Sequence, residues 1–282
     1  MTYLQSIVLA IVQGLTEFLP ISSSGHLVIF QNYFDLKPPI FFDVMVHVGT
    51  LGAVLVYFRK KIAKIATGLI RRKKQSWRLA GVIVLGTLPA VIVGLILQPR
   101  LGKIFDSITL VGVSLMVTAL FLLSTKFHKI KNISEVKHGL CHPPRRWKNE
   151  GDVINLTWQR SLFIGFFQAL AILPGVSRSG STIAAGLFKK LNQEEAFYFS
   201  FLLAIPAIIG ALVLQLVDIS SHWQLFVEKG ILTQSIVGMA ISSLVGYWAL
   251  VGLKKVLTKG KLWVFGIYCL GLGFGLLVFK SF

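Results

Sequence analysis

The sequence predicts an all-α polytopic membrane protein, with six transmembrane helices and two re-entrant broken-helix hairpins arranged as an inverted-topology repeat. The composition indicates a membrane location, because 54% of the 282 residues are hydrophobic and only 14% are charged, a balance outside the usual range of soluble proteins. The chain also carries a formal net charge of +18. In so apolar a chain, this excess indicates a protein oriented by its basic loops rather than a nucleic-acid-binding protein. We expect one integral membrane domain, residues 1–282.

Six stretches are long and apolar enough to cross a bilayer, whose hydrocarbon core of roughly 30 Å takes about 20 residues of helix. The predicted spans are residues 40–58, 79–98, 108–125, 196–217, 231–252 and 262–279. Two further apolar regions, residues 1–34 and 161–188, do not form clean crossings.

Both of these regions are interrupted near the middle by Pro, Gly and several Ser, in the sequences QGLTEFLPISSSGH and QALAILPGVSRSGST. Such residues release the backbone from the helix, and irregular backbone at membrane depth is tolerated only where protein or a wet cavity satisfies its polar groups. We therefore predict a broken hairpin in each region, which enters and leaves the membrane on one face.

The loops after alternate crossings test this arrangement through the positive-inside rule. One face receives 23 of the 29 basic residues and five of the 11 acidic residues, which together account for the whole net charge. That face is predicted to be cytoplasmic, and its loops are residues 59–78, 126–160, 189–195 and 254–261. Both termini are predicted to lie on the outer face.

The basic loop 126–160 joins two halves that follow the same plan. Residues 1–125 and 161–279 each begin with a broken hairpin and continue with three spans. In both hairpins a Gln precedes Leu-Pro and a Ser-x-Ser-Gly sequence, which indicates an internal repeat. Because three crossings is an odd number, the second hairpin must enter from the opposite face, so that the two broken segments meet near the midplane.

Glu17 is the only formal charge in residues 1–34, and Arg178 is the only one in residues 161–188. An ionisable side chain at membrane depth is costly and indicates a functional site with a charged partner. The two residues are therefore predicted to pair. The simpler interpretation is an ion pair that only holds the two repeats together, but it leaves the surrounding polar residues unexplained.

The second hairpin has the chemistry of an anion site. A guanidinium, hydroxyl groups and glycine-exposed amides stand just before an apolar half-helix, whose N-terminus presents N–H groups to an anion, and the Arg fork matches phosphate oxygens. The alternative is a helix-packing contact of small residues. The predicted phosphate-binding residues here are Ser177, Arg178, Ser179, Gly180 and Thr182.

The first hairpin offers the groups for nucleophilic and acid–base catalysis. Gln13 and Glu17 are four residues apart and share a helix face. Ser22, Ser23 and Ser24 supply hydroxyl groups, while His26 supplies an imidazole that can act as acid, base or nucleophile. Glu17 is predicted either to orient or deprotonate a partner or to hold a divalent cation that bridges phosphate oxygens.

These two motifs resemble the signature motifs of the undecaprenyl-diphosphate phosphatase family, also known as bacitracin-resistance proteins. The matching residues are Gln13-Gly-Leu-Thr-Glu17-Phe-Leu-Pro-Ile-Ser-Ser23-Ser-Gly-His26 and Pro174-Gly-Val-Ser177-Arg178-Ser-Gly-Ser-Thr182. The resemblance implies hydrolysis of a C55 polyprenyl diphosphate to the monophosphate, which recycles the lipid carrier for peptidoglycan synthesis. It also implies a bacterial plasma (inner) membrane location, a divalent cation (Mg²⁺ or Ca²⁺), an active site open to the outer, periplasmic face, and a homodimer.

By position, the resemblance assigns catalytic roles to Glu17, Ser23, His26 and Arg178, with Ser22 and Ser24 beside them in the diphosphate site. Gln13 matches the first member of a Glu/Gln-x-x-x-Glu pair that would hold the metal. Because only Glu17 is anionic here, we expect a cation held mainly by Glu17, water and the diphosphate. The expected nucleophile is Ser23, assisted by Glu17 or His26, and the alternative nucleophile is His26.

Other interpretations stay open at this point. A secondary transporter or polyprenyl-phosphate flippase would share the inverted repeat and the broken helices. An acid-phosphatase-type lipid phosphatase is disfavoured, because no His follows Ser177-Arg178 before residue 222. Asp43 and His47, four residues apart, either line the mouth of the pocket, or Asp43 lies at the membrane interface and His47 forms a hydrogen bond between helices. The sequence predicts no role for Cys141 or Cys269.

Overall fold

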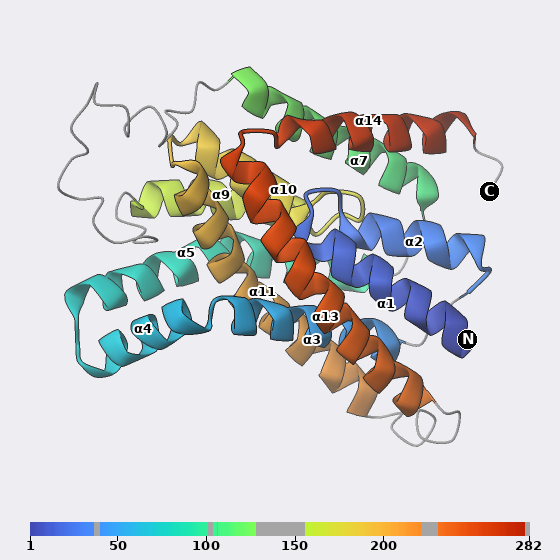
Figure 1. The fold of residues 1–282 in the computed structure, drawn as a ribbon, viewed down its shortest axis with the longest axis horizontal. Coiled ribbons are helices and arrows are strands. Elements are labelled where there is room, and N and C mark those ends of the chain that lie inside the picture. Colours follow the sequence, from blue (N-terminus) through green and yellow to red (C-terminus); the bar gives the residue numbers. More distant parts are fainter. Residues whose placement is uncertain (37–39, 101–103, 106, 128–155, 221–230, 280–282) are drawn as a thin grey trace.

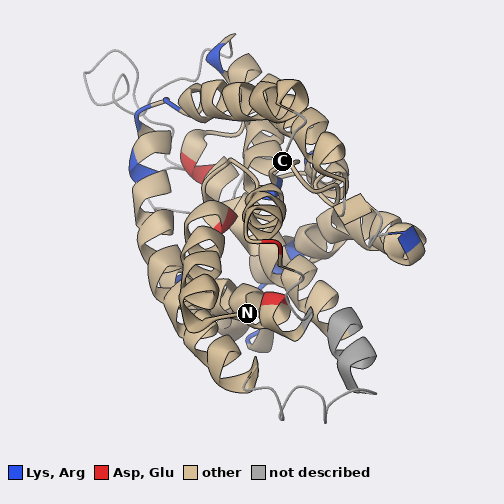
Figure 2. Ribbon diagram, turned by 90° about the vertical axis from the view of Figure 1, so that its right-hand side faces the viewer, with Lys and Arg blue, Asp and Glu red and all other residues tan. Residues whose placement is uncertain are grey.

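All regular structure that the computed structural model describes is helical, which confirms the predicted class. The described residues are 1–36, 40–100, 104–105, 107–127, 156–220 and 231–279, so that Cys141 and most of the 126–160 segment lie outside them. The start of α1 and the end of α14 lie at one end of the molecule (Figure 1). Figure 2, a view from that end, shows that few charged residues interrupt the helices.

The first predicted hairpin forms two helices, α1 (Tyr3–Phe18) and α2 (Ser23–Tyr33). Thr2 caps the start of α1 in a capping box with Gln5. The helix ends at Leu19, whose extended backbone suits a residue that precedes a proline. After a short turn, Ser22 caps α2 through a hydrogen bond from the Gly25 N–H. The predicted interruption is therefore a turn between two capped helices.

The second hairpin is built in the same way, from α9 (Trp158–Leu170) and α10 (Arg178–Phe188). Thr157 caps α9 and Ser177 caps α10. The turn between these helices contains Gly175, whose φ of 98° lies in the left-handed region that favours glycine. A Cβ at this position would also lie 2.5 Å from the Val111 carbonyl oxygen of α7.

Helices lie at all six predicted spans, although fewer of them meet a strict test for crossing a membrane. Four of the described helices are long and apolar enough, α5, α7, α11 and α13, and α3 with α4 would make a fifth span bent by 75°. Helix α14 has 16 residues, a length of about 24 Å. The bounds are α3 (Ile40–Tyr57), α4 (Arg59–Ile70), α5 (Lys74–Leu97), η1 (Gln98–Arg100), α7 (Ile108–Ser124), η2 (Thr125–Phe127), α11 (Gln193–Ser220), α13 (Ile231–Thr258) and α14 (Trp263–Val278).

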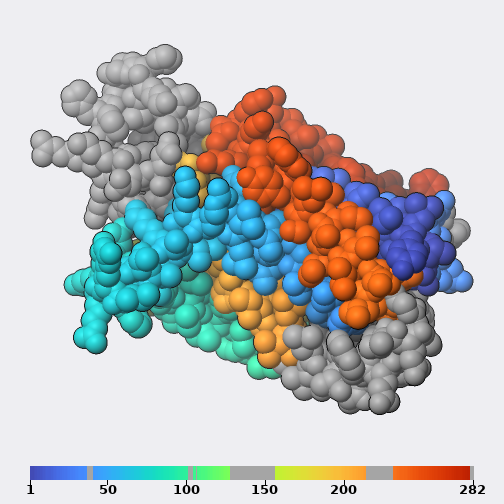
Figure 3. Space-filling model, turned by 60° about the horizontal axis from the view of Figure 1, so that its bottom comes forward, coloured from blue at the N-terminus to red at the C-terminus, as the bar shows by residue number. Residues whose placement is uncertain are grey.

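The segment 59–78, predicted as a connection between two spans, is largely helical, since α4 and the first turn of α5 occupy most of it. Ile62, Ile65 and Leu69 recur at helical spacing and are partly buried. Gly68 lets α4 approach α5 closely, since a Cβ there would lie 2.0 Å from Ser76 Oγ. The α4–α5 hairpin, cyan in Figures 1 and 3, projects from the end opposite the termini.

The remaining packing encloses the two hairpin turns. Helix α13 lies against α1 and α3, and Figure 3 shows α13 (orange) crossing α3 on the face that comes forward. Helix α14 packs along α7, and α5 packs along α9. The turn between α1 and α2 and the turn between α9 and α10 therefore meet inside the helical assembly, where the predicted site residues come together.

Candidate active site

The two hairpin turns are joined directly by a hydrogen bond. The backbone N–H of Gly175 donates to Ser22 Oγ at 3.1 Å. The backbones also approach closely, because a Cβ on Gly25 would lie 3.0 Å from the Gly175 Cα. This contact brings residues 153 positions apart in the sequence into one site.

The serine caps of α2 and α10 make the same side-chain hydrogen bonds, which is the structural counterpart of the repeated Ser-x-Ser-Gly sequence, although their backbones differ, with φ of 72° at Ser22 and −75° at Ser177. Ser22 Oγ accepts from the Gly25 N–H at 3.2 Å, and Ser177 Oγ accepts from the Gly180 N–H at 3.1 Å. In each motif the cap hydroxyl also lies 3.3 Å from the hydroxyl two residues later, that of Ser24 or Ser179. Ser23 and Arg178 thus occupy equivalent positions, the first residue of each helix.

A cavity of about 160 Å³ lies between the two turns. It takes residues from both hairpins and one residue from α3. The lining residues are Glu17, Ser22, Ser23, Ser24, His47, Ala171, Val176, Ser177 and Arg178.

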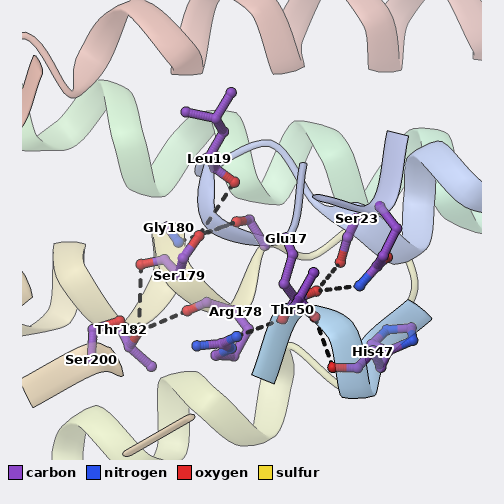
Figure 4. A network of polar contacts seen from close by, with 12 residues as sticks. Glu17, Leu19, Ser23, His47, Thr50, Arg178, Ser179, Gly180, Thr182 and Ser200 are labelled. Carbon is purple, nitrogen blue, oxygen red and sulfur yellow. Dashed lines mark hydrogen bonds and ion pairs between the residues drawn. The ribbon is translucent and has the colours of Figure 1, made fainter. Parts of the chain in front are cut away.

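Glu17 accepts from three side chains around this cavity (Figure 4). Arg178 Nη2 lies 2.6 Å from Glu17 Oε1, which forms the predicted ion pair between the hairpins. Ser23 Oγ donates to Glu17 Oε2 at 2.6 Å, and Gln13 Nε2 donates to the same oxygen at 3.2 Å. A hydroxyl in this position can pass its proton to the carboxylate directly.

The guanidinium of Arg178 has donor capacity left over. Its Nη1 is buried and has no hydrogen-bond partner among the described residues, although nearly all buried polar atoms in proteins are paired. The guanidinium also lies over the Phe201 ring, 5.8 Å from the ring centre. An anion in the cavity would supply the missing acceptor.

The two histidines near the site have different positions. His47 lines the cavity, and its Nδ1 donates to the Asp43 carbonyl oxygen at 2.7 Å, which leaves Nε2 for other partners. His26 is not among the lining residues. Its Nδ1 lies 2.7 Å from the Ser22 carbonyl oxygen, and its Nε2 lies 2.7 Å from Tyr268 Oη. His47, whose role the sequence left open, is therefore the cavity histidine.

Three residues predicted to bind the diphosphate form hydrogen bonds with the protein at the start of α10. Ser179 Oγ donates to the Leu19 carbonyl oxygen at 3.3 Å. Thr182 Oγ1 lies 2.7 Å from the Arg178 carbonyl oxygen and 2.6 Å from Ser200 Oγ. The Gly180 N–H is occupied by the Ser177 cap. None of the three lines the cavity.

Thr118, on α7, supports the second turn and was not predicted. Its Oγ1 accepts from the Ser177 N–H at 2.9 Å and donates to the Gly175 carbonyl oxygen at 2.9 Å. A threonine inside an apolar helix gives no sequence signal for such a contact, since its partners lie 57 and 59 residues away.

The residues around Glu17 do not form a complete metal site. Among the described residues there is no group of three or more His, Cys, Asp or Glu that suits a metal ion. Both carboxylate oxygens of Glu17 already accept hydrogen bonds, while the buried Gln13 Oε1 has no hydrogen-bond partner in the described part of the chain. The oxygen atoms of Glu17 and Gln13 suit a hard divalent ion only where phosphate oxygens and water complete its coordination.

Comparisons with known proteins agree on one family. The family model described as bacitracin resistance protein BacA matches residues 6–275. A protein named undecaprenyl-diphosphatase from Methanococcus maripaludis strain C6 is 37% identical over 98% of this chain and 100% of its own length. One of the same name from Desulfosudis oleivorans is 39% identical over 96% of each chain. A protein named undecaprenyl-diphosphatase 4 from Bacillus thuringiensis is 38% identical over 97% of this chain and 95% of its own length.

Proposed function

The chain belongs to the bacitracin resistance protein BacA family, and we propose that it hydrolyses undecaprenyl diphosphate to undecaprenyl phosphate and inorganic phosphate. This reaction would recycle the lipid carrier for peptidoglycan synthesis and give resistance to bacitracin. One observation carries the proposal. Arg178, whose buried Nη1 has no hydrogen-bond partner within the described ranges, lines the same cavity as a serine hydroxyl that lies 2.6 Å from a carboxylate. An anion-binding group and an activated nucleophile are what phosphoryl transfer requires.

In the first step Ser23 Oγ attacks the terminal phosphorus of the diphosphate, and its proton passes to Glu17 Oε2. The bond between that phosphorus and the bridging oxygen breaks, and undecaprenyl phosphate leaves with the electron pair. The proton on Glu17 then passes to the departing monophosphate. Arg178 neutralises the charge on the transferred group, the larger part of catalysis in reactions of this type.

In the second step water hydrolyses the phosphoserine. Glu17, again a carboxylate, takes a proton from the attacking water, and the bond from phosphorus to Ser23 Oγ breaks. Ser23 recovers its proton from Glu17, and inorganic phosphate leaves. The geometry supports Ser23 over His26 as the nucleophile, because His26 does not line the cavity and both of its ring nitrogens already have partners.

A divalent cation, Mg²⁺ or Ca²⁺, would enter with the substrate, bound to phosphate oxygens and water, with Glu17 as its anionic protein ligand and Gln13 Oε1 beside it. It would supply further neutralisation of the diphosphate charge. The incomplete set of protein ligands among the residues that the structure describes supports this arrangement over a site that holds the metal permanently.

We further propose that six spans and two re-entrant hairpins form an inverted repeat of residues 1–125 and 161–279, joined by the cytoplasmic loop 126–160. The matching caps of α2 and α10 support the repeat. Both termini and the opening of the active site would face the periplasm across the inner membrane, and the protein would act as a homodimer. The basic α4–α5 hairpin, at the end away from the termini, supports this orientation.

The test is phosphate release from C55 polyprenyl diphosphate by the purified protein, with and without EDTA and without any ion gradient. We expect release that EDTA suppresses and that Arg178→Ala abolishes, while Arg100→Ala, at an exposed position, behaves as wild type. Absence of release, or near-normal release by Arg178→Ala, would overturn the proposal and favour transport of the intact lipid. Phosphate release that EDTA does not affect would show that the reaction needs no divalent cation.

A further inference from the structure

Helix α14 contacts the first hairpin through two adjacent side chains, Tyr268 against α2 and Cys269 against the turn before it. The Tyr268 hydroxyl lies 2.7 Å from His26 Nε2, and the two rings stack with centres 5.7 Å apart and planes 11° apart. Cys269 Sγ lies 3.8 Å from the Pro20 carbonyl oxygen. These contacts come from the last helix of the chain, 242 residues beyond His26, and the reaction steps above assign them no role.

The hydrogen bonds of His26 determine the tautomer of its ring. The Ser22 carbonyl oxygen can only accept, so His26 Nδ1 must donate the 2.7 Å bond to it. In a neutral imidazole the other nitrogen then carries a lone pair, which accepts the Tyr268 hydroxyl proton. Both nitrogens are therefore engaged in one fixed tautomer, away from the cavity.

His26 stabilises a strained residue. Ser22 has a φ of 72°, a left-handed conformation that is unfavourable for a residue with a Cβ and persists only where the surroundings hold it. Its carbonyl oxygen accepts from both the ring and the backbone N–H of His26. Ser23, the next residue, lies 2.6 Å from Glu17.

We propose that Tyr268 is a positioning residue for the phosphatase reaction, acting through His26 on the Ser22 turn that holds Ser23 beside Glu17. The inference rests on the proposed function of this site. His26 is then a positioning residue too, and it transfers no proton to or from the substrate. The chain of contacts is continuous, from Tyr268 Oη to His26, from His26 to the Ser22 carbonyl, and along the backbone to Ser23.

The second turn is also supported by a helix from the other half of the chain. Thr118 of α7 bonds directly to the backbone of Gly175 and Ser177, whereas Tyr268 of α14 reaches the first turn through the His26 side chain. Helices α7 and α14 pack along each other. The pair thus contacts both turns, each from the half of the chain that does not contain that turn.

The first experiment compares Tyr268→Phe with wild type in the phosphate-release assay. The variant keeps the stacked ring and loses only the hydroxyl, and we expect kcat to fall about tenfold, as the loss of one well-formed hydrogen bond implies. KM should stay within about twofold and the pH profile should keep its position, because no titrating catalytic group changes. The matched control is Tyr247→Phe, a partly buried tyrosine of α13 in an aromatic cluster, which should behave as wild type.

The second experiment compares His26→Asn with His26→Ala. The Asn amide can donate to the Ser22 carbonyl from near the place of Nδ1, so we expect it to recover much of the kcat that Ala loses, without a change in the pH profile. Three results would overturn the inference: normal kcat in Tyr268→Phe, phosphate trapped on His26, or loss of one limb of the pH profile in His26→Asn.

A spectroscopic measurement separates this inference from the proposed function. Nitrogen-15 NMR of the histidine side chains in the full-length protein, with His26→Asn to assign the signal, should show His26 protonated at Nδ1 and its Nε2 signal altered in Tyr268→Phe. A proton on Nε2 instead would overturn the positioning role even if the enzyme releases phosphate. Failure of wild type to release phosphate, with the expected spectrum, would overturn the function alone.

Discussion

Glu17 and Arg178, 161 positions apart in the sequence, form an ion pair of 2.6 Å between the two hairpins. The side chains are 8% and 15% exposed, respectively, so each charge depends on the other for most of its neutralisation. Removing one partner of a buried pair leaves an uncompensated charge, which usually costs about 3–5 kcal/mol. The pair therefore joins the two hairpins, and it leaves Arg178 Nη1 without a hydrogen-bond partner in the part of the chain that the structure describes.

Replacing Arg178 separates these two roles. Arg178→Lys keeps a positive charge but loses the planar fork, so we expect it to preserve much of the stability and little of the activity. Arg178→Ala should lose activity by about 10³-fold or more, as the removal of an arginine from a phosphoryl-transfer site does. The measurements are phosphate release and thermal unfolding in detergent. Activity of Arg178→Lys close to that of wild type would show that the positive charge alone suffices and that the planar guanidinium has no role.

Ser23 is predicted to be the nucleophile, and its neighbour Ser24 provides the matched comparison. Both hydroxyls line the cavity, but only that of Ser23 contacts Glu17. Ser23→Ala should reduce phosphate release by about 10³-fold or more and prevent the trapping of a phosphoenzyme. Ser24→Ala should lose about tenfold or less. If the two variants were equally active, the 2.6 Å contact with Glu17 would have no catalytic meaning.

His47 is predicted to bind the diphosphate from the side of Glu17 opposite Arg178 (Figure 4). Its Nδ1 is fixed by the Asp43 carbonyl, so Nε2 is the nitrogen available to a phosphate oxygen. His47→Ala should raise KM about tenfold with a smaller effect on kcat, which is the pattern expected when a binding contact is lost. His47→Gln, which can still donate a hydrogen bond, should restore most of the affinity. An unchanged KM in the alanine variant would contradict this role.

Much of this site could be predicted because charge at membrane depth demands a partner. Glu17 and Arg178 are the only charges in their hairpins, and the structure pairs them. The serine caps were not predicted, although the repeated Ser-x-Ser-Gly sequence marks both of them. The sequence did not predict that the buried Ser179 and Thr182 side chains lie outside the cavity lining. Their direction depends on the rotation of α10 about its axis and on the hydrogen-bond partner on α11, Ser200.

The two histidines show the same limit. Their order in the sequence favoured His26, which follows the serine run, over His47, which stands in an apolar span. Which histidine lines the cavity depends on the bond between His26 and Tyr268 and on the direction of α3 past the cavity. Both are determined by packing between helices that are distant in the sequence. Helix α4 was not predicted for a different reason. Its many basic residues indicated a connection between spans, and the helical spacing of Ile62, Ile65 and Leu69 was not considered.

Thr118 offers the last prediction, on the support of the second turn. Thr118→Val keeps the side-chain shape but removes the hydroxyl that pairs with the Ser177 N–H and the Gly175 carbonyl. Two buried backbone groups would lose this partner, at a cost of about 1–3 kcal/mol each. We therefore expect a lower unfolding temperature and a reduced kcat, with recovery in Thr118→Ser.

The matched control is Thr87→Val. Thr87 is also buried in a long apolar helix, but its hydroxyl donates only to the Ile83 carbonyl of its own helix, an oxygen that serves the α-helical ladder as well. Its loss should change the unfolding temperature and kcat little, and the difference between the two valine variants measures the support that α7 gives to the turn. Equal effects would mean that Thr118 contributes only as a packed side chain, and that the Gly175–Ser177 turn keeps its shape through its contact with Ser22 alone.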